Sequence, residues 1–324
     1  MTAPETALDA ARMAADDAEV DTGPETRQFT LGAEAHGQRL DKTLAVLVPE
    51  FSRSHLQHLV ADGQVQIDEV VASVASRKVK AGQRLAVTLV LPAEARAFTP
   101  QAMALDVVYE DSHLLVVNKP AGLVVHPAAG NWSGTLLNGL LARDAQAARL
   151  PRAGIVHRLD KDTSGLMVVG RSLEAVTALV RDLAAREVHR RYLALAHGDV
   201  CSQPFTVDAP VGRDPAVRVR MAVTPQGKPA RTDVFPVARE GGISAVRCQL
   251  HTGRTHQIRV HMASRGHPLV ADAVYGGKPA LGLQRQALHA VELELAHPID
   301  RRPLAFRAEP PADFAAAWAA VVPR

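Results

Sequence analysis

The sequence predicts an α+β fold, in which a small N-terminal α/β module precedes a main domain built on a mixed, largely antiparallel sheet. Strand-like and helix-like apolar segments do not alternate regularly along the 324 residues, which disfavours a doubly wound parallel sheet. Residues 92–100 have a proline at or near each end and no periodicity, and they separate a short first region from a long second one. A chain of this length holds about two domains.

Composition divides the chain into four predicted segments. We expect an acidic tail over residues 1–28, a small module over 29–91, a linker over 92–103 and the main domain over 104–324. Residues 1–26 hold seven acidic side chains against one arginine, a net −6, so the rest of this +3 chain carries +9. Such a tail is expected to be disordered or weakly helical. The basic remainder suits a polyanionic partner, although ordinary solubility charge is an alternative explanation.

The small module is predicted to contain two helices followed by strands. Residues 39–48 carry leucines at helical spacing, and Ser52 is a suitable N-cap for a second helix that Gly63 ends. Residues 65–67 alternate as a strand, a turn follows them, and residues 84–91 form a later strand.

Apolar periodicity in the main domain predicts several strands and four helices. Residues 188–196 alternate, so Tyr192 and Ala194 share one side of their strand. Thr135 and Ser172 are suitable N-caps for two of the helices. The other expected elements are strands over 107–111, 114–117, 166–169, 245–250 and 291–295, helices over 256–263 and 313–322, and loops with short hairpins over 207–237.

One loop of the main domain concentrates ionisable side chains directly before a predicted strand. Residues 154–170 read GIVHRLDKDTSGLMVVG, with the charges in the first half and an apolar run in the second. A charged loop held by a rigid strand is a place where a fold can carry chemistry. Most charged loops are only solvated turns, so this interpretation depends on what other segments supply.

Residues 157–166, HRLDKDTSGL, resemble the signature of the RluA-type pseudouridine synthases, which isomerise uridine in RNA. Further segments fit the same pattern in order and extend the likeness over about residues 105–310. These segments are 118–122 (NKPAG), 190–192 (RRY), 253–261 (GRTHQIRVH) and 285–290 (RQALHA). The chain is most similar to the D branch of the family. The resemblance implies the family's α+β architecture and large-subunit ribosomal RNA as the partner.

The small module resembles an S4 RNA-binding domain, and residues 38–42 (QRLDK) and 52–54 (SRS) carry that likeness. Cationic side chains bind phosphate without reading sequence, so we interpret the basic face of the module as an RNA contact rather than only as a solvated surface. The residues predicted to bind RNA are Arg39, Lys42, Arg53, Lys78 and Lys80 in the module, and Lys119, Arg254 and His256 in the main domain.

Asp160 is the predicted catalytic residue. Its competitor in the loop, Asp162, can accept hydrogen bonds from the amides after it in an Asx-type turn, which is a structural role. Asp160 is then left as the reactive carboxylate, and the resemblance implies the same assignment. A carboxylate can act as a nucleophile at an anomeric carbon, as in glycosidases. To stay ionised in a sheltered site, Asp160 needs a neighbouring cation, because burial alone raises a carboxyl pKa. The resemblance supplies this cation at Arg259, whose alternative role is a phosphate contact.

Three further residues are candidates for holding an everted uridine. Tyr192 could stack on the base or, by resemblance, act as a late general base, and its alternative is a core tyrosine. Arg158 is the candidate wedge for the vacated space, and its alternative is an ion pair with Asp162. Leu288 would form the apolar floor of a uracil pocket, although a leucine near a strand is usually core.

The expected reaction needs no cofactor, because nothing is oxidised, hydrolysed or transferred to a second substrate. Asp160 either attacks C1′ or removes the C2′ proton to give a glycal, and the sequence leaves both routes open. The freed uracil then turns, and its C5 bonds to C1′.

Three competing interpretations are weaker or lead elsewhere. A metal site is disfavoured because His256 and His261 are five apart and arginines lie among the histidines of residues 251–267. The HRLD sequence at residue 157 echoes a kinase loop, but no glycine-rich nucleotide loop accompanies it. The serious alternative is an RNA-binding or ribosome-assembly factor without chemistry.

Location and assembly are expected to be simple. No apolar run approaches the roughly 20 residues that a membrane span needs, and no secretory signal begins the sequence. Two cysteines, Cys201 and Cys248, fit a reducing compartment. We therefore expect a cytoplasmic monomer.

Overall fold

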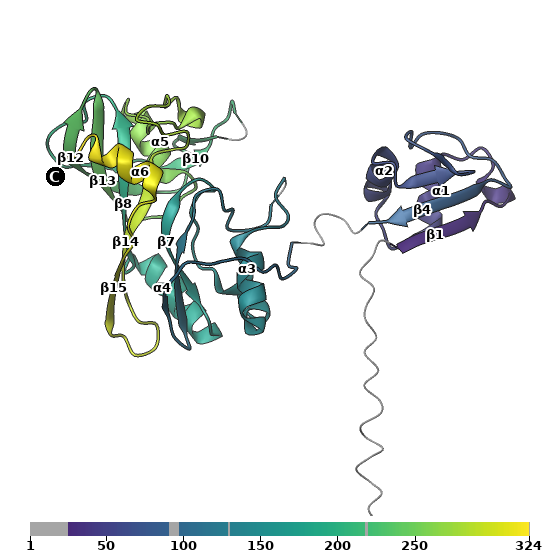
Figure 1. Ribbon diagram of the computed structural model, residues 1–324, viewed down its shortest axis with the longest axis horizontal. Helices are drawn as coiled ribbons and strands as arrows, with labels where there is room; N and C mark the ends of the chain where they lie inside the picture. Colours follow the sequence, from purple (N-terminus) through teal and green to yellow (C-terminus); the bar gives the residue numbers. More distant parts are fainter. Residues whose placement is uncertain (1–24, 91–96, 129, 218–219, 324) are drawn as a thin grey trace, which may run out of the picture. The chain divides into compact units, whose positions relative to one another are not determined.

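The computed structural model describes residues 25–90, 97–128, 130–217 and 220–323. The chain divides into two compact units, Met1–Pro92 and Ala93–Arg324 (Figure 1). Most of the predicted acidic tail and half of the predicted linker lie outside the described residues. The two predicted boundaries of the linker therefore stay predictions.

The first unit is a four-stranded antiparallel sheet with two helices against it. The strand order is β1-β4-β2-β3. Its elements are β1 (Glu25–Thr30), α1 (Leu40–Leu47), α2 (Arg53–Ala61), β2 (Val65–Ile67), β3 (Val70–Val71) and β4 (Arg84–Leu89). Leucines at the predicted helical spacing pack into one core with strand valines, which explains why so short a sheet is stable. The predicted N-cap is confirmed, because Ser52 Oγ accepts a hydrogen bond from the His55 amide at 3.2 Å.

The prediction of an unstructured tail is wrong for residues 25–28, which belong to β1. This strand pairs with the edge of β4 from Glu25 opposite Leu89 to Thr30 opposite Arg84. Because β1 is itself an edge strand, one side of its backbone and most of its side chains face solvent. Its composition is therefore polar and gives no apolar alternation to detect.

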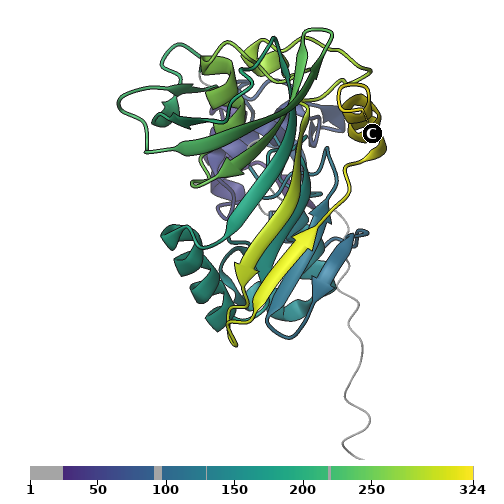
Figure 2. The ribbon, with the colours of Figure 1, turned by 90° about the vertical axis from the view of Figure 1, so that its left-hand side faces the viewer.

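The second unit contains a nine-stranded mixed sheet in the order β5-β6-β7-β14-β8-β13-β12-β9, with β15 paired to β14. The only parallel pairing among the described strands of this sheet joins β7 to β14, which confirms the predicted, largely antiparallel fold. Figure 2 shows the long strands β8, β14 and β15 running through the unit. The strands are β5 (Val107–Glu110), β6 (Leu114–Lys119), β7 (Ser164–Gly170), β8 (His189–His197), β9 (Phe205–Asp208), β12 (Arg231–Glu240), β13 (Ile243–Leu250), β14 (Leu288–Ala296) and β15 (Pro303–Arg307), and β10 (Val211–Arg213) pairs apart with β11 (Met221–Val223).

Four helices pack against this sheet: α3 (Leu136–Arg143), α4 (Leu173–Ala185), α5 (Gln257–Ser264) and α6 (Ala312–Ala319). The largest core joins α3 and α5 to Met167 of β7 and to Tyr192 and Ala194 of β8. Alternate residues of the same strands, such as Leu166 and Leu193, join separate clusters with α4 and α6. Since alternate strand residues point to opposite faces, the sheet carries apolar cover on both faces.

Two strands of the sheet were not predicted from the sequence, and one helical residue was predicted on the wrong face of its helix. Residues 231–240 form the ten-residue strand β12, whereas loops with short hairpins were expected over 207–237, and β15 was not expected. Both strands expose many of their side chains, which weakens the apolar signal. The helical spacing of Val176, Leu179, Val180 and Leu183 predicts one apolar face of α4, yet Val180 is 51% exposed.

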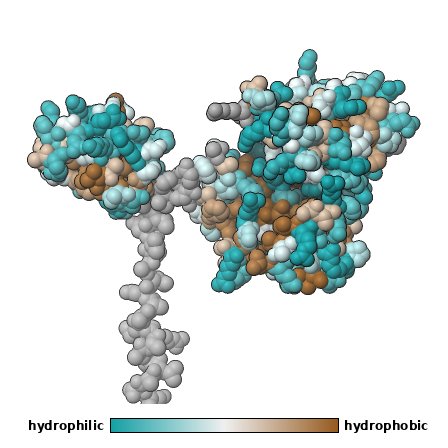
Figure 3. Space-filling model, turned by 180° about the vertical axis from the view of Figure 1, so that it is seen from behind, coloured by the Kyte–Doolittle hydropathy of each residue, from teal (hydrophilic) through white to brown (hydrophobic). Residues whose placement is uncertain are grey.

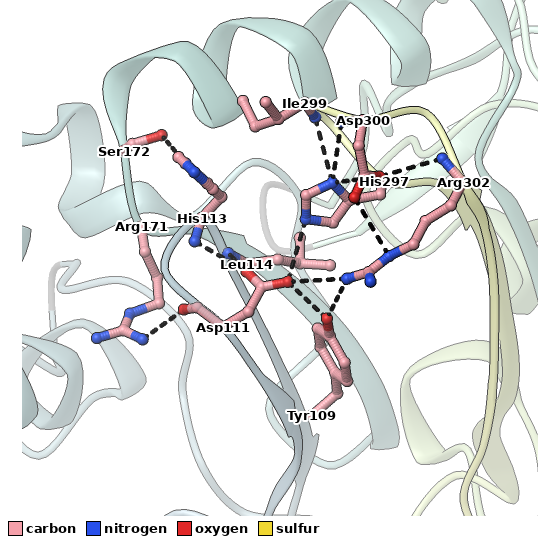
Figure 4. A network of polar contacts seen from close by, with 10 residues as sticks. All are labelled: Tyr109, Asp111, His113, Leu114, Arg171, Ser172, His297, Ile299, Asp300 and Arg302. Atoms are coloured by element: carbon pink, nitrogen blue, oxygen red, sulfur yellow. Dashed lines mark hydrogen bonds and ion pairs between the residues drawn. The ribbon is translucent and has the colours of Figure 1, made fainter.

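A polar network fastens the turn after β5 to the hairpin between β14 and β15 (Figure 4). Asp111 accepts backbone hydrogen bonds from His113 and Leu114, both at 2.8 Å. The same carboxylate lies 3.1 Å from His297 Nε2 and 3.3 Å from Arg302 Nη2. One partly exposed acid thus holds two turns that are distant in sequence, and it fixes the end of the sheet opposite the charged loop.

No helix among the described residues is long and apolar enough to cross a membrane. Hydrophilic residues cover much of each unit in the view of Figure 3, and hydrophobic residues gather in patches on the second unit.

Candidate active site

The charged loop of residues 154–163 enters β7 beside the one parallel junction of the sheet. Ser164 and Gly165 pair with His289 and Ala290 of β14. A Cβ on Gly165 would lie 2.2 Å from the Ala290 carbonyl oxygen, and Gly165 has φ +115°, so only glycine allows this close approach. The junction therefore holds the loop against β14, which carries Leu288.

Lys119 is buried and holds the loop through hydrogen bonds, so the prediction that it contacts RNA is wrong. Its residue exposure is 1%, and Nζ donates to the carbonyls of Pro120, Leu123 and Lys161 at 2.8–2.9 Å. Burial lowers the pKa of Lys119 to about 8, against the opposing charges of two loop acids. Three carbonyls match the three N–H groups of an ammonium.

The expected Asx-type turn at Asp162 is not formed. Among the described residues, the Asp162 carboxylate accepts no hydrogen bond from the amides after it. The turn is closed instead by the Thr163 amide, which donates to the Asp160 carbonyl at 3.1 Å. Arg285 Nη1 donates to the Asp162 carbonyl at 3.0 Å. Backbone groups, together with Lys119, therefore set the loop conformation, and both carboxylates remain available for other contacts.

The Asp160 carboxylate lies beside Arg259, as the resemblance implied. Arg259 Nη1 donates to Asp160 Oδ2 at 3.1 Å. Its other two donors, Nε and Nη2, bind Asp272 at 2.7 and 2.8 Å. Burial lowers the pKa of Arg259, but the bonds and charges of Asp272 and Asp160 outweigh it and raise that pKa above its ordinary value. The guanidinium is therefore fixed and charged beside the Asp160 carboxylate.

His256 faces the second oxygen of the same carboxylate. Its Nε2 lies 3.9 Å from Asp160 Oδ1, and its Nδ1 lies 2.9 Å from the Tyr275 hydroxyl. Burial lowers the pKa of His256, and Arg259 adds to this effect while Asp160 opposes it. His256 has φ +56° at the N-cap of α5, so the backbone turns to bring both His256 and Arg259 to the loop. Its predicted RNA contact stays a prediction.

Tyr192 and Leu288 line the same cleft as Asp160, from neighbouring strands. Both are buried, with 4% exposure each. Burial raises the pKa of Tyr192, Arg190 opposes the rise, and Asp160 adds to it. A tyrosine with a raised pKa is a weaker candidate for a general base at neutral pH than for a stacking surface.

The cleft has a volume of about 740 Å³, and its lining is basic. Five arginines and three histidines line it against a single carboxylate, Asp160. Arg158 and Arg254 are exposed at this lining. In the described part of the chain, no acid lies within ion-pair distance of Arg158, so the alternative pairing with Asp162 is not found. Phe98 and Trp132 add aromatic surface to the lining.

Two of the arginines predicted to bind RNA in the first unit form ion pairs with a buried aspartate. Arg39 and Arg53 each donate to Asp41 Oδ2 at 3.0 Å, and the Asp41 side chain is fully buried. Both arginines stay about half exposed, so a phosphate contact remains a prediction for them. Lys42, Lys78 and Lys80 are exposed.

The histidines considered for a metal have protein partners instead. His251 Nε2 lies 2.6 Å from Asp233, and His261 lies 2.9 Å from Thr232 Oγ1 and the Ala209 carbonyl. Within the described ranges, no group of three or more His, Cys, Asp or Glu side chains could hold a metal ion.

Sequence reasoning missed Asp272 and Tyr275, which hold Arg259 and His256 in place. Both lie in an irregular segment after α5, where no periodicity singles them out. A signal did exist, because a buried arginine facing one acid often requires a second to fix its orientation.

Comparisons with known proteins complete the description. A family model described as RNA pseudouridylate synthase matches residues 113–264, and a model of the S4 domain matches residues 38–85. A ribosomal large subunit pseudouridine synthase D of Xanthomonas campestris is 47% identical over 301 residues, with 89% of this chain and 90% of the relative covered. A protein of the same name from Neisseria meningitidis is 47% identical, covering 92% of this chain and 83% of the relative.

Solved structures give the same fold. The human RNA pseudouridylate synthase domain containing 1 aligns with a TM-score of 0.52 and 29% identity, over 66% of this chain and 88% of that one. The human RNA pseudouridylate synthase domain containing 4 aligns with a TM-score of 0.53 at 22% identity, over 65% and 91% of the two chains, which supports the fold alone.

Proposed function

The chain belongs to the RNA pseudouridylate synthase family and is an RNA pseudouridine synthase, and from this premise we propose that it isomerises uridines of large-subunit ribosomal RNA with Asp160 as its catalytic group. The resemblance, the α+β fold and the S4 domain expected from the sequence are thereby confirmed. The observation that carries the proposal for Asp160 is its ion pair with the doubly anchored Arg259 in a basic cleft.

In the proposed reaction, the bond between C1′ and N1 of uridine breaks while Asp160 acts at the ribose. Asp160 either bonds to C1′ or takes the C2′ proton, and both routes remain open. The freed uracil turns so that C5 faces C1′, and a C1′–C5 bond forms as the Asp160–C1′ bond breaks or, on the glycal route, as Asp160 returns the proton to C2′. C5 then loses its proton and N1 gains one. Product and substrate are isomers, so the residues of the cleft need no cofactor.

The proposed roles of the neighbouring residues follow from their positions. Tyr192 stacks on the everted base, a contact worth about 1–3 kcal/mol, and Leu288 lies against its edge. Arg158, exposed and unpaired in the described structure, fills the space that the base leaves. Extrusion costs a few kcal/mol of unstacking, which these contacts offset.

We propose large-subunit ribosomal RNA as the substrate because relatives of that name match about nine-tenths of the chain, and because the S4 domain adds a second basic surface. We also propose that the protein acts in the cytoplasm as a monomer. Another ribosomal or transfer RNA site is the alternative substrate.

The test is a map of pseudouridine in a strain that lacks the gene, complemented with the wild type or with Asp160→Asn. We expect specific large-subunit positions to lose pseudouridine and only the wild type to restore it. Asp162→Asn is the matched control and should restore it, because the Asp162 carboxylate makes no hydrogen bond in the described structure. Restoration by Asp160→Asn would refute the catalytic role. Loss confined to other RNA classes would refute the substrate.

A further inference from the structure

Arg190 lies in the wall of the cleft and is paired with no acid. It precedes Tyr192 by two residues in β8, so both point to the same side of the strand. Arg191 points to the opposite side, where its Nη1 lies 3.0 Å from Glu292. Arg190 is only 7% exposed, and its Nε has no hydrogen-bond partner. Over residues that the structure describes, no carboxylate comes within 4 Å of its guanidinium.

A buried guanidinium without an anion destabilises the free protein, because it loses hydration and gains nothing in return. Burial lowers the pKa of Arg190 accordingly, although an arginine keeps its proton at neutral pH. Arg259, the other buried arginine of the cleft, lies between two carboxylates. The contrast indicates that the counter-anion of Arg190 comes from outside the protein.

His157 provides a second donor without a partner in the same wall. The Val168 amide donates to His157 Nε2 at 3.0 Å, so that nitrogen carries a lone pair and the neutral ring carries its hydrogen on Nδ1. Nδ1 is shielded from solvent and has no hydrogen-bond partner. Burial, reinforced by the charge of Arg190, lowers the pKa of His157 to about 3, which keeps the ring neutral.

We propose that Arg190 and His157 form a phosphate site inside the cleft, which binds a phosphodiester of the RNA strand beside the everted uridine. The inference rests on the proposed function for its ligand. A phosphodiester has two free oxygens, which can accept from the guanidinium and from the imidazole N–H. Binding requires the lining to shift, because Arg190 Nε and His157 Nδ1 are shielded from solvent in the free protein. Gly253 lies directly against this guanidinium, because a Cβ there would lie 2.9 Å from Arg190 Nη1. The single carboxylate of the lining is already paired with Arg259, so nothing in the cleft competes with the phosphate.

The first test compares Arg190→Met with Arg191→Met in the free protein. Methionine keeps much of the volume and removes the charge. We expect Arg190→Met to raise the melting temperature by about 2–4 °C, because an uncompensated charge is removed. Arg191→Met should lower the melting temperature, because it leaves Glu294 without its partner and Glu292 with Arg307 alone. A fall for Arg190→Met of the same size as for Arg191→Met would overturn the inference, because it would give Arg190 a structural role.

The second test measures binding of transcribed large-subunit ribosomal RNA by each variant in an Asp160→Asn background at several salt concentrations. Each phosphate contact contributes a slope of about −0.7 to −0.9 to log K against log salt. We expect Arg190→Met to weaken binding at least about tenfold and to reduce the slope by about one contact, and Arg191→Met to change neither.

The outcomes separate this inference from the proposed function. Weaker binding with an unchanged slope would mean that Arg190 contacts a neutral group, which overturns the phosphate. Normal pseudouridine formation by the wild type with an unaffected Arg190→Met variant would overturn this site alone. Binding with the expected slope change but no pseudouridine would overturn the proposed function alone. No RNA binding by the wild type would overturn both.

Discussion

The tetrapeptide Arg-Leu-Asp-Lys occurs once in each unit, at residues 39–42 and 158–161, and its two copies do different things. In both copies the leucine is buried, with 0% exposure for Leu40 and 4% for Leu159. The first copy begins a helix, whereas the second forms a loop before a strand. Identical side chains therefore meet different surroundings.

The aspartates show the difference most clearly. Asp41 is fully buried and accepts hydrogen bonds from Arg39, Arg53 and Gln57. Asp160 keeps 16% of its side chain exposed and pairs with Arg259 alone among the arginines. An acid saturated by donors stabilises a fold, while an acid with a free oxygen at a cleft can react. Partners distant in sequence decide which role an aspartate has.

The largest expected effect comes from removing each aspartate in turn. Asp160→Asn should lower kcat at least about a thousandfold, with RNA affinity within about tenfold, or roughly 1.4 kcal/mol. Its melting temperature should stay near that of the wild type. Asp41→Asn should instead lower the stability of the first unit by about 1–3 kcal/mol, with kcat unchanged. Activity assays and thermal melts on both variants check that Asp160→Asn loses activity and Asp41→Asn loses stability. Equal loss of activity in the two variants would contradict the comparison.

The two arginines of the repeated tetrapeptide should differ next. Arg158→Ala should reduce kcat/KM by about 10- to 100-fold, or about 1.4–2.7 kcal/mol, because its side chain faces the cleft without an acid partner. Its stability should change by less than about 0.5 kcal/mol. Arg39→Ala should have the reverse pattern, with a loss of up to about 1 kcal/mol of stability. Steady-state kinetics and urea unfolding of the pair would show whether Arg158 is only a surface charge.

Acid should affect the two units over different ranges of pH. The pKa values of His157 and His126 are lowered, chiefly by burial, to about 3 and about 4. The unfolded chain therefore binds protons that these two histidines do not bind in the folded second unit. The stability of the second unit falls as the pH drops below about 6.5, by at least about 1 kcal/mol. The pKa of Asp41 is also lowered, chiefly by its bond to Arg39, so the first unit loses stability only below about pH 4.

Tryptophan fluorescence reports this difference, because Trp132 and Trp318 both lie in the second unit. Backbone circular dichroism follows both units together. His157→Gln should reduce the loss of stability of the second unit between pH 6.5 and pH 4, as followed by fluorescence. A single transition at one pH by both methods would contradict the separation.

Much of the site could be predicted from the sequence because its motif residues lie on regular elements or in the short loop directly before one. The spacing along β8 placed Tyr192, and the loop before β7 placed Asp160. The errors share a physical cause, because each depends on contacts or solvent exposure that the local sequence spacing does not encode. Lys119 looked like a surface cation, yet three backbone carbonyls from separate turns make its burial possible. Asp272 was missed because its partner is Arg259, thirteen residues earlier and on another element. Strands β1 and β15 were missed because exposed edges carry polar side chains.

The parallel junction between β7 and β14 also bears on when the enzyme can first act. Ser164 Oγ and His289 Nδ1, which lie 2.9 Å apart, join segments separated by 125 positions. During synthesis on the ribosome, the charged loop of residues 154–163 emerges long before the strand that holds it. A nascent chain that ends before residue 288 therefore has the acid but lacks its supporting wall, and we expect the enzyme to become competent only after that strand has been synthesised.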